Sequence, residues 1–144
     1  MMCREVMEDI FRIPVPLPNN PLRELNCYLI RGKDRSLLID TGFRMEECRQ
    51  ALFSGLQELG VRMEDTDVLL THLHSDHTGL LPEVAAPESR VFIDDLDRDW
   101  ITGNTRFELE RQEDARFAMT GIPADMLRVV PETHPGRRFA PDPD

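Results

Sequence analysis

The sequence has 144 residues, of which 40% are hydrophobic and 31% are charged, so we expect one water-soluble globular domain. Its formal net charge of −10 argues against a general affinity for nucleic-acid phosphates, and no apolar run is long enough to span a membrane. The acidic N-terminus lacks the apolar core of a signal peptide, so we expect a cytoplasmic protein. The 3 cysteines have no C-x-x-C spacing, which argues against a disulfide framework and a cysteine-rich zinc site.

The first 40 residues predict strands joined by short loops. The strand-like runs are residues 8–17, 25–32 and 36–40, and proline-rich or polar turns separate them. Pro14 and Pro16 suit only an edge strand or the end of a strand. The third run is almost wholly apolar, which predicts a central strand. We therefore expect a β-meander that leads into one sheet.

A strand–helix–strand unit follows. Residues 45–59 predict an amphipathic helix, because Cys48, Leu52 and Leu56 recur at a spacing of four, and Gly60 is placed to end it. Residues 67–70 form a short apolar run that predicts a buried strand. This order predicts two parallel neighbouring strands. A short helix at 80–84 and a strand at 90–94 complete a core that spans residues 10–94.

Residues 95–130 depart from the β/α alternation and predict a helical insertion. Short helical patterns occur at 96–101 and 107–119. Charged residues dominate the second pattern, so we expect an exposed helix that serves as a lid or an oligomer contact. Residues 131–144 are rich in proline and predict a linker-like tail.

Three of the four histidines lie in residues 71–79, directly after the apolar run 67–70. Imidazole and carboxylate groups are good ligands for zinc and similar divalent metals. His72 and His74 are two residues apart, so they point the same way in an extended segment. Asp76 and His77 follow after the chain turns and approach from another side. The segment is therefore suited to two metals, with one pair on each; the alternative is a polar turn with solvated histidines.

The His-x-His-x-Asp-His spacing, with a strand before it and Thr78-Gly79 behind it, resembles the signature of the metallo-β-lactamase-fold hydrolases. Residues 37–42 resemble the strand of that family that ends in Asp-x-Gly. The resemblance implies an α/β fold, a metallo-β-lactamase-like αββα sandwich. It covers about residues 10–93, which correspond to the first β-sheet half with its flanking helices. We expect residues 1–144 to form a single, incomplete domain of this kind.

The resemblance implies a metal-dependent hydrolase in which metal-activated water attacks an ester, thioester, lactam or phosphoester of a small-molecule substrate. It implies that His72 and His74 hold one metal, and that Asp76 and His77 hold a second. Asp76 would also orient the attacking water and so act in catalysis. Asp40 would support the loop through hydrogen bonds as a second-shell residue, or would only form an Asx-type turn. Zinc is the expected metal, as one or two ions, and iron or manganese also suits these ligands.

The second half of the resembled domain carries further ligands that this sequence does not contain. His134, the remaining histidine, is a candidate metal ligand or a surface-loop imidazole. Four donors complete one zinc site but not two, so the alternative function is a truncated, non-catalytic metal-binding or interaction module. A redox di-iron site is disfavoured, because such proteins usually carry a glutamate where His74 stands. The uncovered sheet would expose on the order of 1,000 Å² of apolar surface, which predicts a homodimer.

Overall fold

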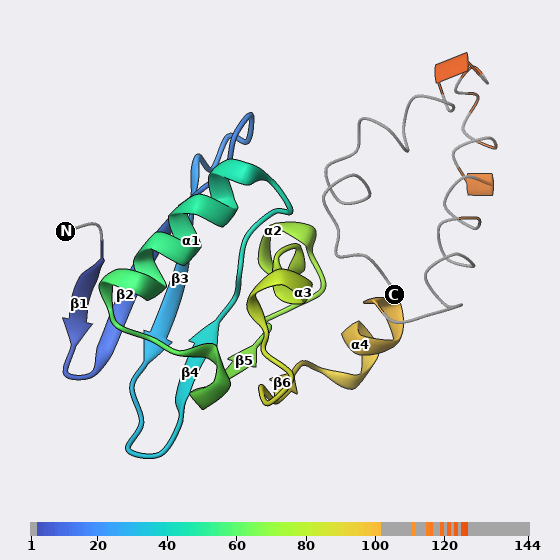
Figure 1. Cartoon of the computed structure of the whole chain (residues 1–144). Helices are drawn as coiled ribbons and strands as arrows, with labels where there is room; N and C mark the ends of the chain where they lie inside the picture. The colour runs from blue at the N-terminus through green and yellow to red at the C-terminus, as the bar shows by residue number, and fades with distance from the viewer. Residues whose placement is uncertain are drawn as a thin grey trace.

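The computed structural model describes residues 3–101 and the isolated residues 111, 115–116, 119, 121, 123 and 125–126. Within residues 3–101 the strands form one six-stranded sheet in the order β1-β2-β3-β4-β5-β6 (Figure 1). The strands are β1 (Arg4–Met7), β2 (Ile10–Pro16), β3 (Glu24–Ile30), β4 (Ser36–Ile39), β5 (Thr66–Leu69) and β6 (Val91–Phe92). The helices in this range are α1 (Glu46–Glu58), α2 (Ser75–Thr78), α3 (Leu81–Val84) and α4 (Asp95–Ile101), with a 3-10 turn at Met63–Asp65.

The sheet is mixed. Strands β1 to β4 form an antiparallel meander, β5 pairs parallel with β4, and β6 pairs parallel with β5. The predicted meander, the central position of β4 and the parallel β4–β5 pair are therefore confirmed. Strand β1 was not predicted, because its four residues are all exposed and leave no alternating apolar pattern.

The expectation that the prolines lie on an edge strand or at the end of a strand is confirmed for Pro16, the last residue of β2, and needs a correction for Pro14. Strand β2 contains Pro14 and Pro16, yet it lies inside the sheet between β1 and β3. Strand β1 pairs only with residues 10–12 of β2, so both prolines lie beyond the end of β1. The side of β2 that faces away from β3 is thus unpaired at the prolines, and a missing N–H costs no ladder hydrogen bond there.

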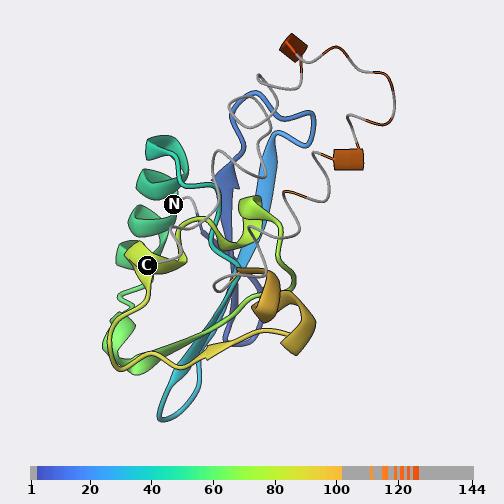
Figure 2. The ribbon, with the colours of Figure 1, turned by 90° about the vertical axis from the view of Figure 1, so that its right-hand side faces the viewer.

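Helix α1 covers one face of the meander (Figure 2). Its buried stripe of Cys48, Leu52 and Leu56 packs on the inward-facing residues of the strands, including Ile13 and Leu29, in one hydrophobic core. Gly55 permits the close approach, because a Cβ atom there would lie 2.5 Å from Cγ2 of Ile13. Gly60 takes a φ of 66° just after the helix, as a C-terminal glycine does.

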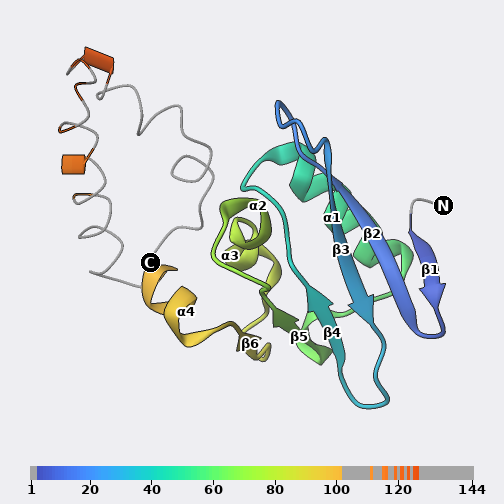
Figure 3. The ribbon, with the colours of Figure 1, turned by 180° about the vertical axis from the view of Figure 1, so that it is seen from behind.

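The opposite face of the sheet is seen in Figure 3. Cross-strand partners share a face, and the register aligns Arg12, Tyr28, Ile39, Leu69 and Phe92 in one row across β2 to β6. The middle three are half-buried, and Phe92 is 46% exposed. Among residues 3–101, α1 covers the opposite face of the sheet, and α4 lies beyond the β6 edge, on the side away from α1 (Figures 2 and 3).

The remaining predicted elements appear with shifted bounds or lie elsewhere. Strand β6 has only two residues, both exposed, where residues 90–94 were expected. The helices predicted at 80–84 and 96–101 correspond to α3 and α4. The helix predicted at 107–119, the tail at 131–144 and His134 lie outside the described residues, apart from isolated positions. None of the helices in the described part is long and apolar enough to cross a membrane.

Candidate functional site

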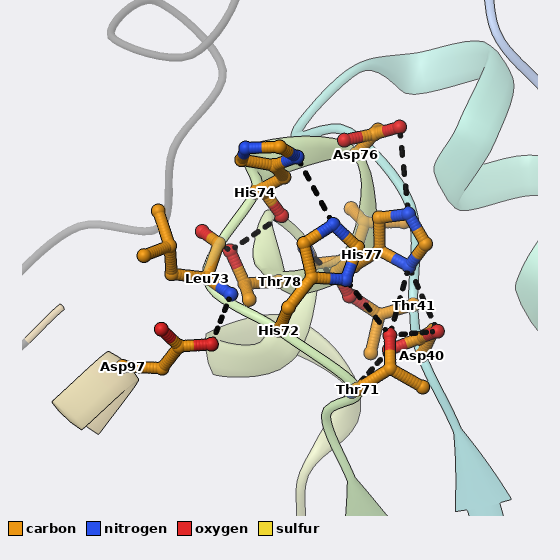
Figure 4. Close-up of polar contacts among 11 residues, drawn as sticks. Asp40, Thr41, Thr71, His72, Leu73, His74, Asp76, His77, Thr78 and Asp97 are labelled. Atoms are coloured by element: carbon orange, nitrogen blue, oxygen red, sulfur yellow. Dashed lines mark hydrogen bonds and ion pairs between the residues drawn. The ribbon is translucent and has the colours of Figure 1, made fainter. Parts of the chain in front are cut away.

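The candidate residues meet at one edge of the sheet. Strands β4 and β5 are parallel neighbours, so their carboxyl ends lie side by side. Asp40 directly follows β4, and residues 71–77, hereafter the donor loop, follow β5 (Figure 4). Two hydrogen bonds join the segments: the backbone N–H and the hydroxyl of Thr41 both donate to the carbonyl of His77, each at 2.8 Å. Parallel pairing of two strands thus brings together residues more than thirty positions apart in sequence.

The donor loop turns within its own motif. His72 and His74 lie in the irregular part of the loop, whereas Asp76 and His77 belong to the single helical turn α2. The hydroxyl of Thr78 donates to the carbonyl of His74 and holds the start of that turn at 3.2 Å. The predicted change of direction between the two pairs is therefore present, in the form of a short helix.

Asp40 is the hub of the loop's hydrogen bonds. Its carboxylate is only 4% exposed and accepts from the backbone N–H of Thr71, from the hydroxyl of Thr71 and from Nδ1 of His77, each at 2.8 Å. Its backbone has a φ of 60°, a left-handed conformation that non-glycine residues adopt at a cost and that Asp tolerates better than most. Burial raises the pKa of Asp40, but the hydrogen bonds from His77 and Thr71 outweigh it, so the pKa lies below its ordinary value.

These contacts fix the tautomers of two histidines. An ionised Asp40 only accepts, so Nδ1 of His77 must carry a hydrogen, and in the neutral ring Nε2 keeps a lone pair. The single hydroxyl proton of Thr71 goes to Asp40, so Nδ1 of His72, 3.0 Å from that hydroxyl oxygen, donates to it. Nε2 of His72 then also keeps a lone pair. Both histidines are thus held in the form that binds a metal through Nε2.

The four donors form two pairs. Nε2 of His72 lies 3.0 Å from Nδ1 of His74, and Nε2 of His77 lies 3.6 Å from a carboxylate oxygen of Asp76. Two ligand atoms on one tetrahedral zinc are about 3.3 Å apart, given zinc–ligand bonds of about 2.05 Å. Each pair therefore fits two positions on one ion. Within the described residues, no group of three or more His, Cys, Asp or Glu side chains could hold a metal ion.

Electrostatics distinguish the two pairs. Burial and the neighbouring imidazoles of His77 and His74 lower the pKa of His72, which favours its neutral form. Burial lowers the pKa of His77, but the hydrogen bond and charge of Asp40 and the charge of Asp76 outweigh it and raise that pKa. The rings of His72 and His77 lie with centroids 4.1 Å apart, so the two pairs are neighbours.

The structure brings Asp40, His72, His74, Asp76 and His77 together, and His134 lies outside the described residues. Sequence reasoning missed the side chain of Thr71, although its place between strand and motif was a usable signal. It also missed Asp97 of α4, which accepts a hydrogen bond from the backbone N–H of Leu73 at 3.1 Å. Nothing in the sequence pattern connects Asp97 with a loop 24 residues earlier.

Comparison with known proteins gives a consistent family. The family model of the Metallo-beta-lactamase superfamily matches residues 21–89. The chain is 36% identical over 101 residues to the probable metallo-hydrolase YqjP of Bacillus subtilis (strain 168), a match that covers 69% of this chain and 31% of YqjP. It is 39% identical over 67 residues to the atrochrysone carboxyl ACP thioesterase of Aspergillus fumigatus, over 46% of this chain and 15% of that protein.

Among solved structures, the metallo-beta-lactamase family protein TTHA1429 from Thermus thermophilus is similar at a TM-score of 0.63 and 30% sequence identity. The match covers 97% of this chain and 48% of TTHA1429. The chain therefore spans about a third of YqjP and just under half of TTHA1429.

Proposed function

Because the chain belongs to the metallo-β-lactamase superfamily, we propose that it is part of a metal-dependent hydrolase whose donor loop holds one or two divalent ions, zinc first among them. The observation that carries the proposal is the pairing of donors: His72 with His74, and Asp76 with His77, each at a separation that suits two ligands of one ion. A solvated polar turn would have no reason to fix two imidazole tautomers through one buried carboxylate.

Each residue has a role in this proposal. His72 Nε2 and His74 Nδ1 would hold one ion, which would displace the hydrogen that His74 Nδ1 donates to His72 Nε2 here, and His77 Nε2 and the Asp76 carboxylate would hold a second. Asp40 holds the His77 ring and, through Thr71, the His72 ring in the orientation and tautomer that metal binding needs. Asp76 would also orient the water that attacks the substrate. A metal bound here would polarise the acceptor oxygen of the substrate and acidify water.

The substrate class proposed is a small molecule with an ester, thioester, lactam or phosphoester bond. A thioester has support from two relatives that carry the name atrochrysone carboxyl ACP thioesterase. The formal charge of −10 disfavours substrates that are recognised through a general attraction to phosphate backbones.

A second candidate function is a metal-binding or interaction module without catalysis. The supporting observation is that no three donor side chains in the described part of the chain form a metal-holding group. Two donors hold an ion weakly, since zinc takes about four ligands. Under this proposal the chain keeps the donor loop and binds metal without turning over substrate.

Metal content per chain, measured by plasma mass spectrometry on protein purified without chelator or affinity metal, tests the proposal. We expect one or two metals per wild-type chain and nearly none in His74→Ala, because that variant loses half of a donor pair. His134→Ala is the matched histidine variant outside the donor loop, and it reports whether His134 adds a donor. A wild-type value near zero would contradict metal binding by this chain.

Hydrolysis assays then separate the two candidate functions. Wild-type protein and His74→Ala are compared on a generic ester, thioester and phosphodiester. Turnover by the wild type that is lost in His74→Ala supports the hydrolase. Bound metal without turnover of any of the three substrates supports the non-catalytic module, and turnover that is unchanged in His74→Ala refutes the site assignment.

A further inference from the structure

The donor loop is anchored by two carboxylates from distant parts of the chain. The backbone N–H of Thr71 donates to Asp40 at 2.8 Å, and the backbone N–H of Leu73 donates to Asp97 at 3.1 Å. These two amides flank His72 on either side, and Leu73 directly precedes His74. The stretch 71–73, which carries His72 and leads directly into His74, is therefore held at both ends by a carboxylate (Figure 4).

Asp97 differs from the other acidic residues around α4. Asp95 and Asp99 pair with Arg98 of the same helix, and the side chain of Asp94 accepts from the backbone N–H of Leu96. These contacts are local and exposed. Asp97 is half-buried and reaches the donor loop. Its contact is also a charge-assisted hydrogen bond, which is stronger than a bond between neutral groups.

The apolar side chains of α4 whose burial is described, Leu96 and Ile101, are exposed or only half-buried. Leu96, which neighbours Asp97 in the helix, is 76% exposed, and β6 ahead of the helix is exposed at both residues. Ile101 at the end of the helix is half-buried, so the polar contact of Asp97 adds to a modest apolar contact in placing α4. The bond between Asp97 and Leu73 therefore links the position of α4 to the geometry of the donor loop.

We propose that Asp97 is a positioning residue for the first donor pair, and that α4 and the metal site are coupled through its hydrogen bond to Leu73. The proposal rests on the proposed function, in that His72 and His74 hold a metal. The coupling is reciprocal: if a docked α4 favours the donor geometry, bound metal favours the docked α4 by the same factor. Helix α4, which begins the predicted insertion 95–130, thus contributes to the metal affinity of the donor loop.

The test measures zinc affinity by competition with a chromophoric chelator for four forms of the whole chain. We expect Asp97→Ala to weaken zinc binding by about tenfold, the lower end of what loss of a ligand-orienting partner costs. Asp97→Asn keeps an oxygen acceptor of the same length and should restore affinity to within about threefold of the wild type. Asp99→Ala, on the same helix and paired only with Arg98 in the contacts described above, should bind zinc as the wild type does.

A second readout is amide hydrogen exchange with and without zinc. Zinc should slow exchange at residues 95–101 in the wild type and in Asp99→Ala, and leave it unchanged in Asp97→Ala. Thermal melts of the zinc-free proteins show whether Asp97→Ala is folded; if it is not, Asp97→Ser, which is too short to keep the contact but remains polar, takes its place in both measurements.

The outcomes separate two failures. A wild-type chain that binds no zinc would overturn the proposed function and this inference with it. A wild-type chain that binds zinc, with Asp97→Ala equal to it in affinity and exchange, would overturn the positioning role alone. A loss in Asp97→Asn as large as in Asp97→Ala would overturn the hydrogen bond as its cause.

Discussion

At the scale of single residues, Asp40 combines unfavourable features that its hydrogen bonds to the donor loop offset. It is buried, it carries a left-handed φ of 60°, and it receives three hydrogen bonds from Thr71 and His77. A strained backbone and a buried carboxylate each cost free energy. The hydrogen bonds offset that cost and, in the same contacts, orient two of the four candidate ligands.

Replacing Asp40 separates these roles. Asp40→Asn keeps a side chain that tolerates the left-handed backbone, but it removes the negative charge and one acceptor oxygen. We expect a folded protein whose zinc affinity falls by about 10- to 100-fold, because the tautomers of His72 and His77 are no longer fixed. Chelator competition measures the affinity, with Asp34→Asn in the exposed β3–β4 loop as the control. Equal affinity in both variants would contradict the supporting role of Asp40.

At the scale of elements, a second buried carboxylate binds the opposite end of the parallel strands. Asp67 of β5 accepts from the side chains of Arg35 and Arg90 and from the backbone N–H of Arg90. The two arginines come from the segments ahead of β4 and β6, and Arg35 also donates to the carbonyls of Glu64 and Glu88. This cluster joins three neighbouring strands at the edge remote from the donor loop.

The cluster makes stability depend on pH. The hydrogen bond from Arg90, ahead of that from Arg35, holds the pKa of Asp67 well below its usual range. A carboxylate with a lowered pKa stabilises the fold above its unfolded-state pKa of about 3.9, and this contribution is lost as the pH falls through the folded-state value. We expect Asp67→Asn to lower the urea midpoint at pH 7, and the gap to the wild type to shrink below about pH 4.

Urea titrations of both proteins at a series of pH values measure that gap. Asp65→Asn is the control, because its partner Arg62 is exposed and only three residues away. Its urea midpoint should stay close to that of the wild type at every pH. A gap between Asp67→Asn and the wild type that stays constant down to pH 2 would contradict the ion-pair account.

At the scale of the whole molecule, the α/β fold class predicted from the sequence is confirmed as a partial metallo-β-lactamase-like domain. One helix layer covers one face of the sheet. The row from Arg12 to Phe92 lies on the other face, and α4 lies beyond the β6 edge on that side. The prediction that a second copy of the chain covers this face, sheet on sheet, stays a prediction.

Sedimentation velocity tests the dimer. We expect a wild-type dimer and a shift towards monomer in Phe92→Glu, which puts a charge into the row. Val91→Glu is the matched control, because the adjacent residue of a strand points to the other face and Val91 is similarly exposed, at 42% against 46%. A monomeric wild type, or equal dissociation of both variants, would contradict a sheet-on-sheet dimer.

The sequence by itself determined the features that depend on near neighbours. The alternation in β2 and β3, the helical stripe of α1, the stop at Gly60 and the two pairs of donors at residues 72–77 all follow from residues a few positions apart. Such patterns are legible because backbone geometry fixes which residues share a face. The family resemblance rests on the same short segments.

Only the tertiary structure decided what distant residues do to one another. It placed β1 beside β2, left Pro14 and Pro16 on an unpaired side, and brought Asp40 and Asp97 to the two ends of one peptide. It also placed the hydroxyl of Thr71 between the carboxylate of Asp40 and Nδ1 of His72, which sets the tautomer of His72. These contacts join residues up to 37 positions apart, and strand order and packing set them, so no local pattern in the sequence encodes them.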